Sequence, residues 1–322
     1  MSQTIALLDV STPARAAHLR ALLPDGFTLV YGTAPGEEPM KALIAEADFA
    51  ISGQVAVPGT VLKAARKLKL LHKWGVGVDN IDIETARALG IKVARTTGSN
   101  ALPVAEFTIG LMLSTLRFLP YGHHMLKQGV WNGPGKLPGE TFLLSGKTVG
   151  IVGLGAIGTN VAKLLRGFGC TILYSKRKRL DPDAEASLGV RHASLDEIIT
   201  TSDVISLHCP LTPETAGMID KAAFARMKSS AVLVNVARGG VVNEADLFDA
   251  LRDKVIRGAA MDVFSVEPAP ADHPLFSLDN IVVTPHLAAV TADTFEPTVL
   301  RMFGNIARAA RGEPIPEGDV VV

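Results

Sequence analysis

Short apolar segments alternate with amphipathic, helix-like stretches along most of the chain. Parallel strands need a long crossover between them, usually a helix, so this alternation predicts parallel sheets covered by helices. In the first part of the chain the expected strands are Ile5–Val10, Thr28–Tyr31, Phe49–Ser52, Leu70–Trp74 and Lys92–Arg95. Helix-like stretches such as Pro13–Leu23 and Val61–Lys67 lie between them.

A second series of strands begins near the middle of the chain, after a helical stretch at Leu102–Leu119 and a Gly/Pro-rich connection at Gly129–Gly139. The first of these strands starts at Thr148. The others are expected at Thr171–Ser175, Asp203–Leu207, Ala231–Asn235, Gly258–Val263 and Asn280–Thr284. Six strands with helices between them are the number in a complete Rossmann sheet.

The last part of the chain is helical over Asp293–Ala310 and then Pro-rich. This helix is too short to form a domain of its own, so we expect it to return and pack on the first domain. The predicted fold class is α/β, with two Rossmann-like or flavodoxin-like parallel-sheet domains. Residues 1–100 and 288–322 would form the outer domain, and residues 101–287 would form a domain inserted into it.

Length and charge narrow the class of protein. A chain of 322 residues is comfortable for two domains, and its 32 basic and 32 acidic side chains give no net charge to attract nucleic acid or an anionic membrane. Two cysteines, Cys170 and Cys209, are too few for a disulfide framework. The N-terminus predicts a first strand rather than a signal peptide, and no apolar run is long enough to span a bilayer. We expect a soluble, cytoplasmic protein.

Three glycines follow the strand that starts at Thr148 at the spacing G-x-G-x-x-G, and a helix-like stretch comes after them. Gly153 permits a tight turn, Gly155 lets the backbone approach a pyrophosphate, and Gly158 lets the helix pack closely on its strand. The inserted domain is therefore predicted to bind a dinucleotide, with Ala156 and Ile157 also at the cofactor. A purely structural strand–turn–helix is the alternative. A turn so late in the chain also predicts that the first domain holds the substrate.

The residues that would select between NAD and NADP lie about 20 positions beyond this turn, at the end of the next strand. No acid stands there to hold a ribose 2′-hydroxyl. Instead Ser175 can donate a hydrogen bond to a 2′-phosphate, and Lys176 and Arg177 can neutralise it. We therefore expect NADP(H) in preference to NAD(H), against the alternative of a solvated basic turn. Lys178 and Arg179 are predicted to be plain surface residues.

Three chemically able side chains follow later strands, where ligands of open α/β sheets bind. They are Arg238, Glu267 and His286. A guanidinium can grip a carboxylate bidentately, an imidazole can exchange a proton, and a neighbouring carboxylate favours the imidazolium and orients the ring. Together they are what reduction of a 2-keto acid needs. Each alone has a simple structural alternative, as a surface arginine, a strand-end cap or a hydrogen-bonded histidine.

The order of motifs resembles that of the D-isomer-specific 2-hydroxyacid dehydrogenase family along essentially the whole chain. The matching segments are Gly75–Asp82, Asn100–Thr108, the glycine turn, Leu207–Thr215, the Arg238 strand end, Asp262–Pro268 and Pro285–His286. The resemblance implies that Arg238, Glu267 and His286 are catalytic. It implies that Val76 and Gly77 offer backbone amides to the substrate carboxylate, and that Asp262 holds the nicotinamide carboxamide. It also places Thr108, Cys209, Pro210, Val236 and Ala237 along the cofactor, with Cys209 as a packing position.

Within this family, reduction of glyoxylate or hydroxypyruvate is the expected activity, because the resembling enzymes that carry an NADPH-type turn act on these small 2-keto acids. The main alternative is a 3-phosphoglycerate dehydrogenase. Those enzymes carry an arginine near the position of Ser52 that helps bind the phosphate, and its absence argues against a phosphorylated substrate, although Lys73 could substitute. The chain ends at Val322, so we also expect no appended regulatory domain. A nucleotide-sensing binding protein of the corepressor type is a more distant alternative.

The resemblance also implies a homodimer formed through the cofactor domain. The Gly/Pro-rich arm at Trp131–Gly139 could reach across such an interface, although a loop on the monomer surface is an equally simple explanation. We expect no metal, because the adjacent His123 and His124 cannot share a helix face and no Cys or acid completes a ligand set around them. His18, His192 and His273 are expected in surface helices or loops. His72 and His208 are expected to make local hydrogen bonds.

Overall fold

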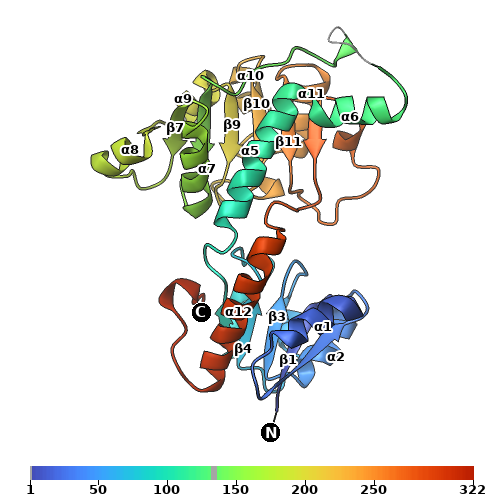
Figure 1. Cartoon of the computed structure of the whole chain (residues 1–322). Helices are drawn as coiled ribbons and strands as arrows, with labels where there is room; N and C mark the ends of the chain where they lie inside the picture. The colour runs from blue at the N-terminus through green and yellow to red at the C-terminus, as the bar shows by residue number, and fades with distance from the viewer. Residues whose placement is uncertain (1, 132–135) are drawn as a thin grey trace. The chain divides into compact units, whose positions relative to one another are not determined.

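A computed structural model describes residues 2–131 and 136–322 (Figure 1). The chain divides into two compact units: unit 1 is Met1–Asn100 with Val290–Val322, and unit 2 is Ala101–Ala289. Unit 1 is thus assembled from two separate segments of the sequence, and unit 2 lies between them in the chain. We expected the return to the first domain at residue 288, and the boundary between the units falls at Val290.

Unit 1 is built on a five-stranded parallel sheet in the order β2-β1-β3-β4-β5. Its strands are β1 (Gln3–Val10), β2 (Phe27–Gly32), β3 (Phe49–Ser52), β4 (Leu70–Lys73) and β5 (Lys92–Ala94). Each expected strand is present within two residues of its predicted ends. The central strands β1, β3 and β4 are largely buried on both faces and therefore stand out as short apolar runs.

Helices cover both faces of this sheet (Figure 1). They are α1 (Pro13–Ala21), α2 (Glu37–Ala45), α3 (Gly59–Leu62), α4 (Ile83–Ala88) and the late helix α12 (Ala292–Ala310). Ile5 and Leu7 of β1 pack with α1 and α12, whereas the alternate residues Ala6 and Leu8 pack with α2, α3 and α4. The helix expected at Val61–Lys67 is wrong in its extent: α3 is a single turn, Gly59–Leu62, and the chain leaves the helical conformation after it.

Unit 2 contains a seven-stranded parallel sheet in the order β12-β11-β10-β9-β6-β7-β8. The strands are β6 (Thr148–Val152), β7 (Thr171–Ser175), β8 (Val190–His192), β9 (Val204–Leu207), β10 (Val232–Asn235), β11 (Gly258–Met261) and β12 (Ile281–Val283). The prediction of six strands is corrected to seven. Strand β8 is three residues long and carries Arg191 and His192 at the sheet edge, so it has no apolar run to reveal it, and His192 lies in a strand rather than in a helix or loop.

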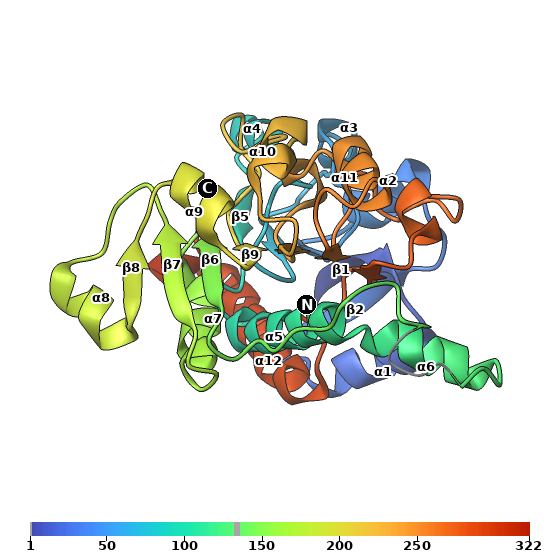
Figure 2. The same ribbon diagram turned by 90° about the horizontal axis from the view of Figure 1, so that it is seen from above.

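Two helical layers enclose the second sheet (Figure 2). The layer formed by α5 (Ala101–Arg117) and α7 (Ala156–Arg166) packs on one face. The layer on the other face comprises α9 (Leu195–Thr201), α10 (Lys221–Arg226) and α11 (Glu244–Arg252). Helix α8 (Pro182–Leu188) connects β7 to β8 at the sheet edge. This arrangement confirms the predicted α/β class with two parallel-sheet domains.

Helix α5 confirms the helix expected at Leu102–Leu119 to within two residues, and a second helix that was not predicted, α6 (Leu119–Lys127), follows it after Phe118 in the left-handed conformation (φ 51°). Arg257 caps the end of α5 by donating hydrogen bonds to the carbonyls of Thr115 and Leu116. Its guanidinium also stacks 4.6 Å from the Phe118 ring. Within the described residues, no single helix is long and apolar enough to cross a membrane, and α5 and α6 meet that test only as a pair bent by 65°.

Candidate active site

The glycine turn lies between β6 and α7 as expected, and Gly153 and Gly158 each have a separate steric reason to be glycine. Gly153 has φ +98°, and a Cβ there would lie 2.6 Å from the Cys209 amide nitrogen, where the next strand's loop passes. A Cβ on Gly158 would lie 2.4 Å from the Gly153 carbonyl oxygen, so only glycine lets α7 start this close to the turn. Gly155 at the N-cap faces open space.

The start of α7 is therefore suited to a pyrophosphate. The first amides of a helix have no partner within the helix, and they carry the positive end of its dipole. Gly155 and Ala156 are exposed, Ile157 is half-buried, and Gly158 is buried against the turn. The turn also lies between β6 and β9, where the strand order reverses, which is the place where open α/β sheets bind their ligands. These residues fit a dinucleotide.

The basic turn after β7 begins beside the glycine turn, because the Ser175 carbonyl accepts a hydrogen bond of 2.9 Å from the Gly153 amide. Ser175 is half-buried, and Lys176 and Arg177 are exposed. Arg177 lies close enough to Glu214, in the loop after β9, to contribute to the lowered pKa of that carboxyl, although the hydrogen bond from Thr212 is the largest cause. The hydroxyl and both cations are thus gathered at the strand end where the cofactor ribose was predicted.

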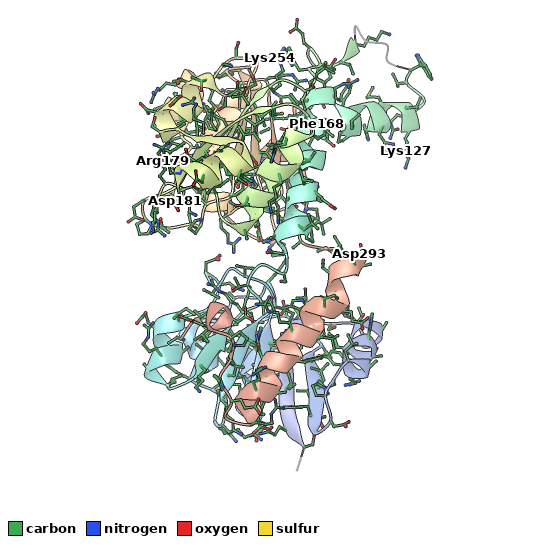
Figure 3. The ribbon with its side chains drawn as sticks, turned by 60° about the vertical axis from the view of Figure 1, so that its left-hand side comes forward. Lys127, Phe168, Arg179, Asp181, Lys254 and Asp293 are labelled. Carbon is green, nitrogen blue, oxygen red and sulfur yellow. The ribbon has the colours of Figure 1, made fainter. Side chains whose placement is uncertain are left out.

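Arg179, labelled in Figure 3, is exposed as expected, but its side chain also links this turn to α8. It donates two hydrogen bonds of 2.8 Å to Glu185 of α8, and Glu185 also accepts one of 2.6 Å from the buried Tyr174 hydroxyl. The hydrogen bonds from Arg179 and Tyr174 lower the pKa of Glu185 to about 2. Sequence reasoning missed this pairing, because Glu185 belongs to an otherwise polar helix with nothing to distinguish it.

The loop after β9 contributes the predicted residues Cys209 and Pro210 on the other side of the glycine turn. Cys209 is buried, and burial raises the pKa of its thiol, which suits a packing position rather than a nucleophile. The preceding His208 is half-buried, and its Nε2 lies 2.8 Å from the Ser206 hydroxyl. Burial lowers the pKa of His208 to about 3, so this histidine is neutral. Pro210 is exposed.

Arg238 follows β10 on a tight turn shaped by Asn235. The Asn235 side chain is fully buried and bonds to the Arg238 carbonyl at 2.9 Å and the Ala237 amide at 3.0 Å. A Cβ on Gly239 would lie 1.9 Å from the Phe264 carbonyl carbon, so this glycine allows the arginine turn to touch the segment that leads to Glu267. Asn235 and Gly239 were not predicted as site residues, although both flank the arginine in the sequence.

Glu267 and His286 form a direct pair, with His286 Nδ1 donating to Glu267 Oε2 at 2.7 Å. Each side chain is 32% exposed. Glu267 also accepts a 2.9 Å hydrogen bond from the Phe264 amide. Burial raises the pKa of the Glu267 carboxyl, but the bonds from His286 and Phe264, with the charge of Arg238, leave it below its usual value. The carboxylate is therefore ionised near neutral pH, and its partner nitrogen on the ring is fixed.

His286 stands on a turn that Asp262 organises from beneath. The buried Asp262 carboxylate accepts hydrogen bonds from the Thr284 hydroxyl at 2.6 Å, the Leu287 amide at 2.8 Å and the Ala288 amide at 2.9 Å. The His286 amide donates to the Asp262 carbonyl at 2.8 Å, and His286 itself has φ +52°. A left-handed histidine costs about 1 kcal/mol and persists only where neighbours enforce it, as at many functional sites. Asp262 thus aims the histidine, a role not predicted.

The remaining predicted residues are placed as follows. Thr108 is fully buried, with its hydroxyl donating to the Val104 carbonyl at 2.6 Å, and Val236 and Ala237 are each 8% exposed. Val76 and Gly77 belong to unit 1, after β4, and both are partly exposed. Their roles stay predictions, as does the absence of a metal; among the described residues no group of three His, Cys, Asp or Glu side chains could hold one.

The fold and the turn of unit 2 define a nicotinamide-dinucleotide-binding protein of the α/β class. Residues 109–288 match the family model described as D-isomer specific 2-hydroxyacid dehydrogenase, NAD binding domain. The chain belongs to the D-isomer-specific 2-hydroxyacid dehydrogenase family, as its motifs predicted.

Individual relatives carry different names. The chain is 38% identical to a D-3-phosphoglycerate dehydrogenase of Mycobacterium tuberculosis, over 92% of its own length and 56% of that protein. It therefore spans little more than half of the phosphoglycerate dehydrogenases that it matches. It is 39% identical to a hydroxypyruvate reductase of Thermotoga maritima, over 80% and 82% of the two chains. A crystal structure of an NADPH-dependent glyoxylate/hydroxypyruvate reductase from Sinorhizobium meliloti, with NADP and malonate, superposes at TM-score 0.86 with 28% identity, covering 100% and 97%.

Proposed function

We propose that this protein reduces a small 2-keto acid to the D-2-hydroxy acid, with NADPH as the preferred reductant. The observation that carries the proposal is the pair of Glu267 and His286, held at 2.7 Å on the same edge of the sheet as the dinucleotide turn. Reduction of a carbonyl to an alcohol consumes one hydride and one proton. A bound nicotinamide dinucleotide supplies the hydride, so the protein must supply the proton.

His286 is the proton donor in this proposal. Its Nδ1 is bonded to Glu267, so exchange with a substrate falls to Nε2 at the other side of the ring. The ionised Glu267 stabilises the protonated imidazolium before the reaction and fixes its tautomer afterwards. Asp262 adds to this by holding the turn under His286 with three hydrogen bonds, which limits how far the ring can move.

Arg238 is the proposed ligand of the substrate carboxylate. Asn235 and Gly239 fix its backbone, and the charge of its guanidinium helps to lower the pKa of Glu267. In unit 1, the Val76 and Gly77 amides donate to no backbone or side-chain acceptor within the described residues. Successive amides of this kind form a site for an anionic group, which supports their predicted role in binding a carboxylate.

The preference for NADPH rests on Ser175, Lys176 and Arg177. The Arg179–Glu185 pair fixes the turn that carries them, and no carboxylate occupies the position that would hold a ribose 2′-hydroxyl. The Sinorhizobium meliloti relative, whose structure contains NADP, has the same overall fold. Glu214 lies near Arg177, and its negative charge offsets part of the attraction of Arg177 for a 2′-phosphate.

Glyoxylate and hydroxypyruvate are the proposed substrates. A phosphoglycerate dehydrogenase is the second candidate, favoured by the 38% identity over 92% of the chain. Two features of unit 1 weigh against a phosphorylated substrate. Ser52 is fully buried, and the Lys73 ammonium, 8% exposed as a residue, is engaged by the Gly53 carbonyl and by Asn80 at 2.8 Å. Neither side chain is presented to a phosphate as the corresponding arginine would be.

Steady-state rates with glyoxylate, hydroxypyruvate and 3-phosphohydroxypyruvate, each with NADPH and with NADH, test the proposal. We expect turnover with the two unphosphorylated acids and a higher kcat/KM for NADPH. A higher kcat/KM for the phosphorylated acid would instead identify the second candidate. Tight NADPH binding without turnover on any acid would favour the nucleotide-sensing alternative.

We further propose a cytoplasmic homodimer. Both cysteines are free, and Trp131, at the start of the predicted arm, is 82% exposed, which is unusual for a tryptophan. Residues 132–135 of that arm lie outside the described residues. Sedimentation equilibrium of the full chain tests this, since a monomer at micromolar concentration would contradict it.

A further inference from the structure

A buried carboxylate in unit 1, Asp319, is tied to two different segments of the chain, helix α12 and the segment that follows β5. It is 0% exposed and receives a bidentate pair from Arg301 of α12, at 2.7 and 2.8 Å. It also accepts hydrogen bonds from the Asn305 amide at 3.0 Å and from the Thr97 backbone amide at 2.9 Å. Arg301 in turn donates to the Thr97 carbonyl at 2.9 Å, so both polar groups of the Thr97 peptide are held.

One route leads from Thr97 to the turn that carries Val76 and Gly77. The neighbouring Thr96 is fully buried, and its amide donates to the Gly75 carbonyl at 3.0 Å. The Gly75 amide donates back to the Thr96 hydroxyl at 3.2 Å. Gly75 has φ +131°, a conformation open to glycine, so the direction of the following amides depends on how this residue is held.

A second route leads to the same turn through Asn305. Its amide nitrogen has two hydrogens, and it lies 3.0 Å from Asp319 and 3.1 Å from His72 Nε2. Donation to both makes His72 Nε2 an acceptor, so His72 Nδ1 carries the hydrogen and donates it to the Lys73 carbonyl at 2.9 Å. Lys73 ends β4, two residues before Gly75.

We propose that Asp319 is a positioning residue for substrate binding, which fixes the Gly75–Gly77 turn through Thr96–Thr97 and through Asn305 and His72. This inference rests on the proposed function, in which the Val76 and Gly77 amides bind the substrate carboxylate. Asp319 itself touches no reacting group. Its effect is to hold the Val76 and Gly77 amides in the orientation that binds the substrate carboxylate. Small displacements of such groups have large effects.

The test compares Asp319→Asn with Glu313→Gln. Asp319→Asn keeps the shape of the side chain but replaces one acceptor oxygen by a donor facing Arg301 or Thr97. Glu313→Gln removes a similar bidentate pair, with Arg311 at 2.7 and 2.8 Å, from the same segment, but on exposed side chains. We expect Asp319→Asn to raise the KM for the keto acid about tenfold with a smaller change in kcat, and NADPH affinity to stay within twofold. Glu313→Gln should leave all three constants unchanged.

Hydrogen exchange measured by mass spectrometry provides a second readout that needs no substrate. Peptides covering residues 74–78 and 95–98 should exchange faster in Asp319→Asn, while the glycine turn of unit 2 should not change. A purely structural role would lower the melting temperature and the active fraction without changing KM. Unchanged KM together with unchanged exchange at residues 74–78 would overturn the inference.

The two proposals can fail separately. If the wild-type protein turns over none of the keto acids, the proposed function fails, and exchange at residues 74–78 still decides whether Asp319 holds the turn. If Asp319→Asn does not fold, Arg301→Lys replaces it, because Arg301 is 42% exposed on its side chain and lysine keeps the charge while losing the bidentate geometry. A raised KM and faster exchange are expected there too, and wild-type values of both would overturn the inference.

Discussion

Each unit of this protein links a histidine to a carboxylate, but the two linkages differ in burial. In unit 1, His72 and Asp319 are both 0% exposed and are joined through the Asn305 amide. In unit 2, His286 and Glu267 are bonded directly at 2.7 Å, and each side chain is 32% exposed. Similar groups therefore serve two different purposes.

Burial decides which purpose each pair can serve. Desolvation lowers the pKa of His72 to about 4, so its ring stays neutral and acts as a fixed donor and acceptor between Lys73 and Asn305. The exposure of His286 leaves its ring accessible to a small molecule, and its partner Glu267 is an ionised carboxylate that fixes one of the two ring nitrogens. The comparison teaches that a histidine–carboxylate pair in a sequence is a sign of chemistry only where the fold leaves it partly open.

The largest expected effect is on the exposed pair. His286→Ala should lower kcat about 10²- to 10⁴-fold, the usual contribution of a general acid, because no other group supplies the proton in the proposed mechanism. NADPH affinity should stay within twofold, since the glycine turn is untouched. Stopped-flow and steady-state rates of NADPH oxidation measure the first, and fluorescence titration the second.

His124→Ala is a matched control, because His124 is exposed on α6 and makes no part of the site. It should behave as wild type. A kcat for His286→Ala within threefold of wild type would remove the distinction between the two pairs and with it the assigned role of His286.

The buried pair of unit 1 should affect how the free energy of unfolding depends on pH in the acid range. The pKa of His72 is lowered on folding, from 6.5 to about 4, so the unfolded chain binds the proton more readily than the folded one. The contribution of His72 to the free energy of unfolding is fully present above pH 6.5. It falls as the pH drops from 6.5 towards 4, by about 3 kcal/mol in all. His72→Gln, which does not titrate, should show a shallower loss over this range in urea unfolding.

Trp74 provides the signal for this measurement, because it lies in unit 1 and is partly buried, whereas Trp131 of unit 2 is 82% exposed and should change little on unfolding. The charged neighbours Asp319 and Arg301 are retained in the variant, so their own titration cancels in the difference. Parallel pH profiles for the two proteins would show that His72 is not the buried neutral group described here.

Most of the candidate site in unit 2 could be predicted from the sequence. Strand ends can be located because parallel strands are apolar on both faces, and Arg238, Glu267 and His286 each follow such a strand within a few residues. The glycine spacing and the basic turn are likewise local signals. Their convergence needed only the rule that parallel strands present their carboxyl ends at one edge.

The supporting residues could not be predicted, because their partners are distant in the chain. The contact between Thr97 and Asp319 spans 222 residues, and a single aspartate in a Pro-rich tail carries no pattern. Asp262 was expected at the nicotinamide, and its three bonds to the His286 turn depend on backbone geometry that only the fold supplies. Strand β8 was missed for a different reason, since it is three residues long and has no apolar run in the sequence.

The smallest expected effect extends the same distinction to two arginines of one turn in unit 2. Arg179 is occupied by Glu185, whereas Arg177 is exposed near Glu214. Arg177→Ala should lower kcat/KM for NADPH about tenfold and leave that for NADH nearly unchanged, because a charged hydrogen bond to a 2′-phosphate is lost from one cofactor only.

Arg179→Ala should lower kcat/KM for NADPH and for NADH to a similar, smaller extent, because it loosens the turn without removing a phosphate ligand. Lys178→Ala is the exposed control, and no change is expected for it. Glu214→Gln sharpens the argument by acting in the opposite direction: removing a negative charge beside Arg177 should raise the NADPH preference, and more so at low salt, where exposed charges are least screened. If Arg177→Ala lowered kcat/KM equally for NADPH and NADH, Arg177 would support the turn as Arg179 does, and the choice of cofactor would lie with Ser175 and Lys176.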